Sequence, residues 1–300
     1  MCNVSANKTE HSEYGDCVQI SNGVIDLLIT VDVGPRIVRY GFVGEDNVFC
    51  EVSNLMIDYI QSKKWGAMGG HRLWHTPEKH PRNYIPDEDP VEWKCTEDGL
   101  LLSQKVELWS QIKKDMEIKL SPDSTEVTIN HTLTNKNAWP IEFGPWACTL
   151  MASGGKEIIP LQARDTGVEC NRSISLWPFA DMNDTRVQWG KKYIQLKQDI
   201  KAEKPFKIGV SNEQGWGAYF NNGTLFVKKF TPEIGEKYSD FGATYETFTN
   251  NIFLEMETLG PLKLVQPEQS VTHTEKWHLF NNVEMPLNED DIDNVVKKFI

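Results

Sequence analysis

The sequence MEIKLSPDSTEVTINHTLT, residues 116–134, contains two strand-like runs joined by a turn. From Val127 to Leu133 the odd-numbered positions share one face of an extended chain, and the polar even-numbered positions share the other. Pro122 and Asp123 between the runs are turn formers, because proline fixes φ and aspartate bonds to nearby backbone. The stretch therefore predicts a β-hairpin with one buried face.

Similar short runs recur along the chain, separated by turn residues. Asn221-Asn222-Gly223 is a strong hairpin signal, because glycine tolerates positive φ. Further strands are predicted at residues 24–31, 36–42, 216–220, 224–230, 252–257, 262–265 and 271–280. This regular spacing predicts an all-β fold with a large antiparallel sandwich or barrel.

Only the C-terminal segment predicts a helix, over residues 288–300. Asn288 is a suitable N-cap, and the acidic residues that follow favour the positive end of the helix dipole. Ile292, Val296 and Phe299 form an apolar stripe that would dock on the sheets. No low-complexity linker or repeat divides the chain, so we expect a single domain over residues 1–300 with its core at about 18–280.

Composition excludes several classes of partner. The 300 residues carry a formal charge of −12, and a strongly acidic chain is a poor ligand for nucleic acid or anionic lipid. Mean hydropathy is −0.46, no apolar run approaches the length of a membrane helix, and residues 1–16 lack the apolar core of a signal peptide. We therefore expect a soluble, cytoplasmic protein that binds neither nucleic acid nor a membrane; a homo-oligomer stays open.

The six cysteines predict neither a zinc site nor a redox centre. They are Cys2, Cys17, Cys50, Cys95, Cys148 and Cys170, and no two form a C-x-x-C pair. In a chain without an export signal they are expected to be buried thiols or bystanders. Six N-x-S/T triplets would matter only in a secreted protein.

The densest polar and aromatic segment is WGAMGGHRLWHTPEKHPRNYIPDED, residues 65–89. A loop rich in rings and titratable groups, without apolar periodicity, is typical of a binding cleft. We select His71 as a catalytic candidate, and Arg72, Trp74 and His75 as substrate-binding candidates. The alternative is a surface loop whose rings pack on a sheet. The i, i+4 spacing of His71 and His75 suits a metal on a helix, but the surrounding glycines and prolines argue against a helix, and we predict no metal site.

A second segment is YETFTNNIFLEMETLG, residues 245–260. In a strand, Glu255 and Glu257 point to the same face. Two such carboxyl groups on an interior strand repel each other, which raises one pKa toward neutrality and suits acid/base catalysis. The alternatives are a solvated edge strand or an ion pair with Lys228, Lys229 or Lys263.

Weaker candidates for substrate binding lie elsewhere in the sequence. They are Trp146, Asp184 in an Asp-Thr-Arg triplet, Lys228 and Glu246.

Several segments resemble the galactose mutarotase-like (aldose 1-epimerase) superfamily. Residues 22–49 resemble its opening hairpin, residues 132–155 its central strand pair, and residues 253–280 its closing block. The blocks GGHRLWHTPE and YSDFGATYETFTN resemble an uncharacterised branch of that superfamily. The resemblance implies a β-supersandwich with a carbohydrate cleft on its concave face, a small-molecule sugar as partner, and no cofactor.

The resemblance also implies a mechanism. A carboxylate removes the proton from the anomeric hydroxyl, an imidazole protonates the ring oxygen, and the opened sugar recloses as the other anomer. Glu255 matches the base best, with Glu257 as a rival, and His71 beside Gly69-Gly70 resembles a histidine of the family. The D-x-R triplet at Asp184 resembles a substrate-binding motif.

One departure affects the expected activity. The segment FGPWACT, residues 143–149, occupies the place where the mutarotases carry their acid histidine, so that proton donor is missing unless His71 or His75 replaces it. Three hypotheses stay open: an aldose 1-epimerase-like enzyme, a non-catalytic carbohydrate-binding module, and a structural or interaction domain. The first predicts that His71, Arg72 and Glu255 or Glu257 converge in one cleft. The second predicts an aromatic cleft without an acid/base pair, and the third predicts that residues 65–89 pack against a partner.

Overall fold

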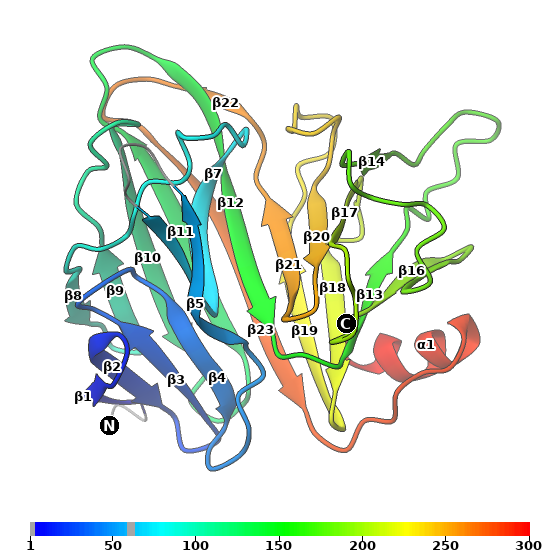
Figure 1. The fold of residues 1–300 in the computed structure, drawn as a ribbon, viewed down its shortest axis with the longest axis horizontal. Helices are drawn as coiled ribbons and strands as arrows, with labels where there is room; N and C mark the ends of the chain where they lie inside the picture. Colours follow the sequence, from blue (N-terminus) through cyan, green and yellow to red (C-terminus); the bar gives the residue numbers. More distant parts are fainter. Residues whose placement is uncertain (1–3, 59–63) are drawn as a thin grey trace.

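Two large antiparallel sheets pack face to face in the computed structural model, which describes residues 4–58 and 64–300 (Figure 1). The structure describes only the backbone of residues 53–58, 64 and 65, so the side chain of Trp65 lies outside the described part, as does all of Cys2. The all-β fold is confirmed: apart from one C-terminal helix and a short 3₁₀ turn, the regular elements of the described chain are strands. Within the described ranges, no helix has the length and apolar character needed to cross a lipid bilayer.

The first sheet contains the strands that carry most of the candidate residues. Its strands, in spatial order, are β1 (Ser5–His11), β2 (Gly15–Ser21), β3 (Ile25–Thr30), β4 (Ile37–Phe42), β7 (His71–Thr76), β12 (Ile141–Met151), β21 (Leu254–Leu259), β20 (Tyr245–Thr249), β17 (Phe206–Val210) and β14 (Ile174–Leu176), with β22 (Lys263–Val265) paired to β12.

The second sheet covers one face of the first. Its strands, in spatial order, are β15 (Val187–Trp189), β16 (Tyr193–Lys197), β13 (Lys156–Pro160), β18 (Trp216–Asn221), β19 (Thr224–Phe230), β23 (Ser270–Phe280), β11 (Val127–Asn135), β10 (Ile112–Leu120), β9 (Gly99–Ser103) and β8 (Glu92–Cys95). A separate ribbon pairs β5 (Glu51–Asp58) with β6 (Lys64–Gly69).

The hairpin predicted from residues 116–134 is β10 paired with β11. Leu120 faces Val127 next to the turn, and buried and half-buried positions alternate along both strands, as the sequence predicts. The Asn221-Asn222-Gly223 hairpin is also confirmed, with Asn222 and Gly223 both at positive φ between β18 and β19.

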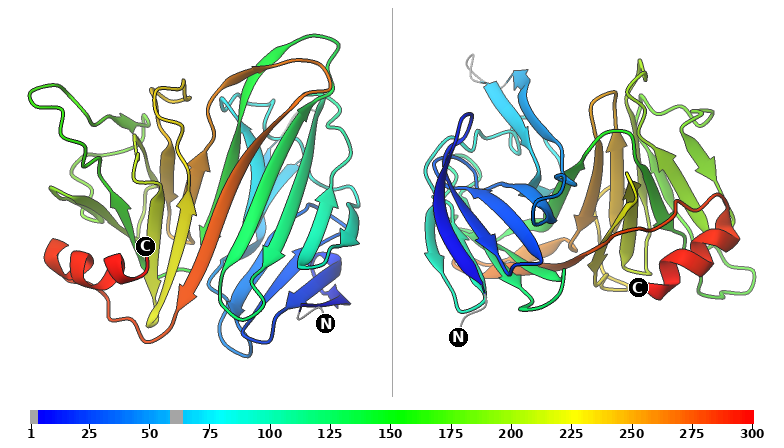
Figure 2. Two further views of the ribbon diagram at one scale, coloured as in Figure 1. Left: turned by 180° about the vertical axis from the view of Figure 1, so that it is seen from behind. Right: turned by 90° about the horizontal axis from the view of Figure 1, so that it is seen from below.

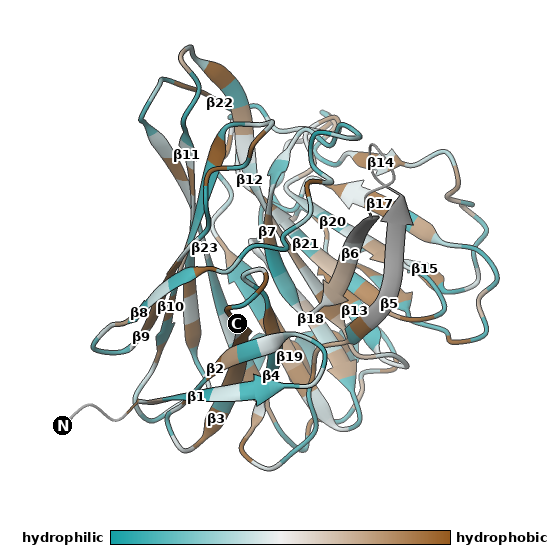
Figure 3. Ribbon diagram, turned by 60° about the vertical axis from the view of Figure 1, so that its left-hand side comes forward, coloured by the Kyte–Doolittle hydropathy of each residue, from teal (hydrophilic) through white to brown (hydrophobic). Residues whose placement is uncertain are grey.

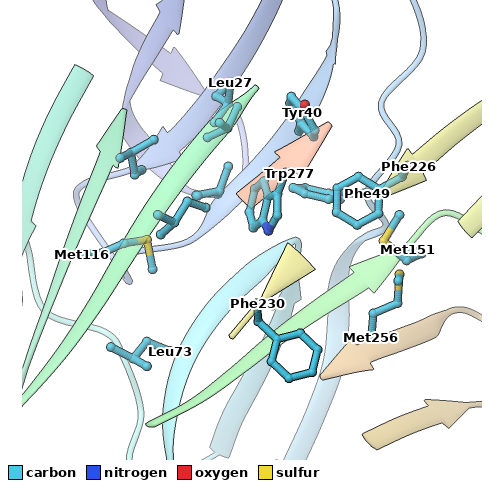
Figure 4. Close-up of a cluster of buried hydrophobic side chains, with 14 of the residues drawn as sticks. Leu27, Tyr40, Phe49, Leu73, Met116, Met151, Phe226, Phe230, Met256 and Trp277 are labelled. Atoms are coloured by element: carbon cyan, nitrogen blue, oxygen red, sulfur yellow. The ribbon is translucent and has the colours of Figure 1, made fainter. Parts of the chain in front are cut away.

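The main core lies between the two sheets. Tyr40 and Phe49 from the first half of the chain meet Phe226 and Trp277 from the second half, and the ring centroids of Phe49 and Trp277 are 5.3 Å apart (Figure 4). Hydrophobic residues concentrate on strands such as β3, β18 and β19, whereas the loops are mostly hydrophilic (Figure 3). Burial of this apolar surface holds the two sheets together.

The C-terminal helix α1 (Glu289–Val295) begins where the sequence predicts. The Asn288 side chain accepts a hydrogen bond from the backbone N–H of Asp291, and a 3₁₀ turn, η2 (Val296–Lys298), continues the helix. Ile292 and Val296 are buried against the outer face of β13 and β18. Helix α1 lies at the opposite end of the molecule from the N-terminal strands (Figures 1 and 2).

The prediction that residues 65–89 form a loop is wrong for their first half. Residues 64–69 and 71–76 are the strands β6 and β7, and every residue of β7 is buried. Both faces of β7 are covered, so its sequence has no apolar alternation to reveal a strand. Positive φ at Gly69 and Gly70, together with backbone contacts that a Cβ would overlap, explains the two glycines between these strands.

Candidate functional site

A cavity of about 380 Å³ lies on the face of the first sheet that points away from the second sheet. Side chains of β7, β12, β21, β20 and β17 form its floor, and residues from β6 and from the segments after β7 and β14 form its walls. The lining residues are Ala67, Arg72, Trp74, Glu78, Tyr84, Trp146, Leu150, Trp177, Phe179, Lys207, Phe248, Asn250, Phe253, Glu255 and Glu257.

Strand alternation decides which side chains reach this cavity. On β21, Glu255 and Glu257 face the cavity, whereas Met256 lies in the core between the sheets. The strand register places Glu257 directly between Cys148 of β12 and Glu246 of β20. The sequence prediction that the two glutamates share a face of one interior strand is therefore matched by their positions.

Glu255 forms an ion pair with Arg72. Oε1 of Glu255 lies 2.9 Å from Nη2 of Arg72, and both side chains are almost buried. The Arg72 guanidinium also lies 4.4 Å from the ring centroid of Trp74. Although burial opposes its charged form, Glu255 holds the pKa of Arg72 above its usual value. The pair fixes a carboxylate at one position of the cavity floor.

Glu257 sits in a different electrostatic setting. Its Oε2 accepts hydrogen bonds from Trp146 Nε1 at 2.8 Å and from Lys207 Nζ at 3.0 Å. Burial raises the pKa of Glu257 to about 7, against the opposing effect of the Lys207 ammonium, and the nearby Glu255 adds to the rise. This carboxyl group therefore exchanges its proton near neutral pH.

Lys207 joins Glu257 to Glu246, which lies next to the cavity floor. Its Nζ is 2.9 Å from Oε2 of Glu246, and Oε1 of that carboxyl group has no hydrogen-bond partner among the described residues. Burial raises the pKa of Glu246 well above its usual value. One buried ammonium between two buried carboxyl groups leaves one negative charge uncompensated, which favours a proton on the pair.

Aromatic rings line the walls around these charges. Trp74 meets Tyr84 and Trp146 edge to face at 5.1 and 5.2 Å between ring centroids. Lys207 Nζ lies 4.7 Å from the ring centroid of Trp177 and 4.9 Å from that of Trp146. Rings beside convergent polar groups are typical of a site for a small ligand that is apolar on one face.

His71 and His75 point away from the cavity. They occupy the face of β7 opposite Arg72 and Trp74, and both are buried between the sheets. His75 lies near Glu107, and the Asn83 side chain donates to its backbone carbonyl. The prediction that His71 converges with Arg72 and Glu255 or Glu257 in one cleft is wrong, because adjacent residues of a strand point to opposite faces of the sheet.

His71 belongs to a polar cluster inside the core. Its Nε2 is 2.7 Å from Nε2 of His131 and its Nδ1 is 2.8 Å from Oγ1 of Thr149. Lys228 is also there, with Nζ 2.6 Å from Thr149 Oγ1 and 3.0 Å from Oε1 of Glu275. Lys228 is thus buried between the sheets, on the side of the first sheet opposite the cavity. It pairs with Glu275, so the alternative that it forms an ion pair with Glu255 or Glu257 is wrong.

His71, His131 and Glu275 are close enough for their ligand atoms to share a metal ion. Burial, together with the neighbouring His131 and Lys228, lowers the pKa of His71 well below its usual value. The Lys228 ammonium, 3.0 Å from Glu275, repels a metal cation and already neutralises that carboxylate. The cluster is therefore better described as a hydrogen-bonded part of the core.

The Asp184 triplet also lies outside the cavity lining. Asp184 and Arg186 bind each other, with Oδ2 of Asp184 2.7 Å from Nη2 of Arg186, and Arg186 also donates to the carbonyl of Lys204. The D-x-R pattern here closes a turn of the chain. Five cysteines lie in the part of the chain that the structure describes, and all five are free thiols: Cys17, Cys50, Cys95, Cys148 and Cys170.

The sequence analysis missed Lys207 and Trp177. Lys207 stands in the run FKIGV, residues 206–210, where Phe206, Ile208 and Val210 are buried in the core. A lysine on the other face of a strand with a buried apolar face could have indicated a functional residue. Trp177 gave no signal, because it follows the short strand β14 outside any periodic segment; in the structure its ring lies next to Gly209 and lines the cavity.

No family model matches the sequence, and no curated protein is recognisably similar to it. Solved structures do match the fold, and aldose 1-epimerase and galactose mutarotase-like proteins recur among them. The chain therefore has the galactose mutarotase-like fold, as the sequence resemblance predicts.

Three of these structures give the extent of the likeness. A candidate mutarotase from Salmonella typhimurium has a TM-score of 0.57 at 9% identity, over 92% of this chain and 94% of its own. A candidate aldose 1-epimerase from Escherichia coli K12 has a TM-score of 0.51 at 12% identity, over 93% and 99%. A TPR-domain-containing protein from Parabacteroides distasonis has a TM-score of 0.60 at 10% identity, over 91% of this chain and 49% of its own. At such identities the likeness concerns the fold alone.

Proposed function

We propose that the chain is a carbohydrate-active enzyme that interconverts the anomers of a sugar by acid/base catalysis in the cavity on the first sheet. The observation that carries the proposal is the pair Glu255 and Glu257, which share one face of β21 in two different electrostatic settings. Their Cα atoms are about 7 Å apart, as residues i and i+2 of a strand are. Two carboxyl groups at this spacing can reach two neighbouring oxygens of one sugar.

In this proposal Glu255 is the base and Glu257 is the acid. Glu255 removes the proton from the anomeric hydroxyl, and Arg72 compensates the charge of the ionised carboxylate. Glu257, whose pKa of about 7 keeps a proton available at neutral pH, protonates the ring oxygen, so that the ring bond breaks and an open-chain aldehyde forms. After the aldehyde rotates, the two transfers reverse and give the other anomer.

The aromatic walls support a sugar as the ligand. Trp74, Trp146 and Trp177 offer flat apolar faces for the C–H side of a pyranose, while the carboxyl groups and Arg72 offer partners for its hydroxyls. The galactose mutarotase-like fold of the neighbouring structures supports the same ligand class. No step in this proposal uses the buried His71 or His75.

The proposal is tested by NMR exchange spectroscopy on the α and β resonances of a panel of free aldoses. We expect saturable anomer exchange above the buffer rate for the wild-type protein. Glu255→Gln is expected to lower that exchange about 10²- to 10⁴-fold, the usual contribution of a proton-transfer group, while saturation-transfer NMR still detects sugar binding. Glu268→Gln, the same change at an exposed residue that pairs with Lys136, is the matched control. Sugar binding without exchange in the wild type would contradict the enzyme.

A non-catalytic sugar-binding module is the second candidate function. It is favoured by one observation: among the described residues, no histidine lines the cavity, so the acid of the related mutarotases has no imidazole equivalent there. This module would give saturation transfer from the same aldoses with anomer exchange at the buffer rate, and Glu255→Gln would change affinity only.

A further inference from the structure

We infer that the sugar bound in this cavity carries a positively charged amino group, which the Glu78 carboxylate and the neighbouring rings of Trp74 and Tyr84 recognise. This inference rests on the proposed sugar-binding function and adds a substrate class to it. It follows from the balance of charges among the described residues of the cavity and from the side chains around Glu78, which forms no ion pair with them.

Among the residues whose side chains the structure describes, two cations line the cavity, and both are already neutralised by carboxylates of the protein. Arg72 lies 2.9 Å from Glu255, and Lys207 lies within 3.0 Å of both Glu246 and Glu257. A phosphate or carboxylate on a ligand would therefore have to displace one of these buried carboxylates, and it would be repelled by the others. The cavity thus disfavours an anionic sugar.

Among the described side chains, carboxyl groups outnumber cations around the cavity. Arg72 and Lys207 face Glu78, Glu255 and Glu257, and Glu246 adds a fourth carboxyl group beside Lys207. When the Glu246 and Glu257 pair holds one proton, three negative charges still face two positive charges. The remaining charge attracts a cation into a partly desolvated space, where electrostatic interactions are stronger than in water.

Glu78 is the lining carboxylate without an ion pair among the described residues. No Lys, Arg or His nitrogen of those residues lies within 4.0 Å of its carboxyl oxygens, its charge acts on Lys207 only from a greater distance, and it accepts a hydrogen bond from the hydroxyl of Tyr84. This bond leaves the second oxygen of Glu78 for a ligand. Glu78 lies two residues beyond the end of β7, at the wall of the cavity that also holds Trp74 and Tyr84.

The rings beside Glu78 suit an ammonium group. The Trp74 and Tyr84 rings meet edge to face at 5.1 Å, and both line the cavity. An ammonium placed over an aromatic face gains roughly 0.5–2 kcal/mol, and a carboxylate beside the rings adds an ion pair. The protein already uses this geometry for its own cations, with Arg72 over Trp74 and Lys207 between Trp146 and Trp177.

The test compares ligands that differ in charge at one position. Calorimetric titration at pH 6.5, where an aliphatic amine is protonated, would measure 2-amino-2-deoxy-aldoses, the parent aldoses, their N-acetyl derivatives and the corresponding uronic acids. We expect each amino sugar to bind about tenfold more tightly than its parent aldose, and the uronic acid to bind most weakly. Higher ionic strength is expected to reduce the preference.

Glu78→Gln tests the assignment to one residue. We expect it to abolish most of the tenfold preference for the amino sugar. Glu142→Gln removes the same charge from an exposed pair with Lys237 outside the cavity, and is expected to retain the preference. Equal loss in both variants would assign the preference to the overall charge and overturn the role of Glu78.

The outcomes separate this inference from the proposed function. If parent and amino sugars bind with equal affinity, or the uronic acid binds best, the inference fails while the sugar-binding function stands. If no sugar in the panel binds to the wild-type protein, the proposed function fails as well, and the inference falls with it.

Discussion

At the scale of single residues, the proton on Glu257 determines the expected pH dependence of anomer exchange. As the proposed acid, Glu257 must be protonated, and its pKa lies at about 7 because burial disfavours the charged form. We therefore expect the exchange rate to fall as the pH rises through about 7. NMR measurements of the exchange rate from pH 5 to pH 9 test this decrease, which we call the alkaline limb of the pH profile.

Glu246→Gln identifies the origin of that limb. The change removes the carboxylate that shares Lys207, so the ammonium would act on Glu257 alone and lower its pKa. We expect the alkaline limb to move to lower pH by about one unit, and Glu268→Gln to leave it in place. A limb unmoved by Glu246→Gln would assign the titration to another group.

Lys228 shows how a buried charge differs from the charges of the cavity. It is fully buried, pairs with Glu275 at 3.0 Å and donates to the carbonyl of Met256 between the two cavity glutamates. Lys228→Met would leave Glu275 as an uncompensated buried carboxylate, at an expected cost of about 3–5 kcal/mol in the free energy of unfolding. Urea unfolding measures this loss.

Two further variants bound the interpretation. The surface variant Lys237→Met, which breaks an exposed pair with Glu142, is expected to cost less than about 1 kcal/mol. The double variant Lys228→Met with Glu275→Leu should recover part of the loss only, because the Nε1 donor of Trp277 would lose its acceptor. A Lys228→Met protein as stable as the wild type would refute the buried ion pair.

At the scale of elements, local periodicity was enough to predict some strands and misleading for others. β11 was predicted because buried and half-buried residues alternate along it. β21 was predicted because apolar and acidic residues alternate from Leu254 to Glu257, although the whole strand is buried. β7 is buried to the same extent but was taken for a loop because polar and aromatic residues occupy both of its faces, and His71 was grouped with Arg72 because they adjoin in sequence. Neighbouring residues of a strand point to opposite faces, here the core and the cavity. Recognising residues 71–76 as a strand was therefore necessary to tell which of them could line the cavity.

Helix α1 provides a prediction that follows from its docking. Ile292 is fully buried against β13 and β18, so Ile292→Ala is expected to lower the free energy of unfolding by about 2–5 kcal/mol. Asn288→Ala removes the N-cap hydrogen bond and should cost about 1 kcal/mol. Asp290→Ala, at an exposed position of the first turn, is the control, with an expected change within about 0.5 kcal/mol. If Ile292→Ala costs no more than the control, the helix does not stabilise the sandwich.

At the scale of the whole molecule, the cavity joins residues that no sequence window contains. Arg72, Trp146, Lys207 and Glu257 come from four strands that are neighbours only through pairing of distant segments. The sequence predicted Arg72, Trp146 and the two glutamates as candidates, but which of them meet depends on the order β7-β12-β21-β20-β17. That order is fixed by long-range packing, so neither the role of Lys207 nor the exclusion of the histidines could be read from local patterns.

The buried titratable groups of the whole chain predict how stability depends on pH. Burial raises the pKa of Glu157 to about 8 and that of Glu257 to about 7, so between pH 4.5 and these values the folded protein binds more protons than the unfolded chain. Their contribution to the free energy of unfolding therefore falls as the pH rises. Buried histidines act in the opposite direction: their pKa values are lowered by burial, so they destabilise the fold as the pH falls below about 6.5. These histidines are His71, His75, His131 and His273.

The two effects place the expected maximum of stability near pH 6.5. Below this pH the four histidines outweigh the carboxyl groups. Above it the folded protein still holds the Glu157 proton that the unfolded chain has released, which lowers the free energy of unfolding by about 2 kcal/mol between pH 6.5 and pH 8. Urea unfolding at pH 5, 6.5 and 8.5 measures the curve. Glu157→Gln, which keeps the hydrogen bond from the Tyr245 hydroxyl but cannot ionise, should flatten the decline above pH 6.5 and leave the decline below it. Tyr245 packs in the core and Glu157 lies on β13 of the opposite sheet, so Glu157 is completely buried between the sheets. If the free energy of unfolding of Glu157→Gln fell above pH 6.5 as steeply as that of the wild type, Glu157 would ionise in the folded state without cost, which would contradict the expected effect of this burial.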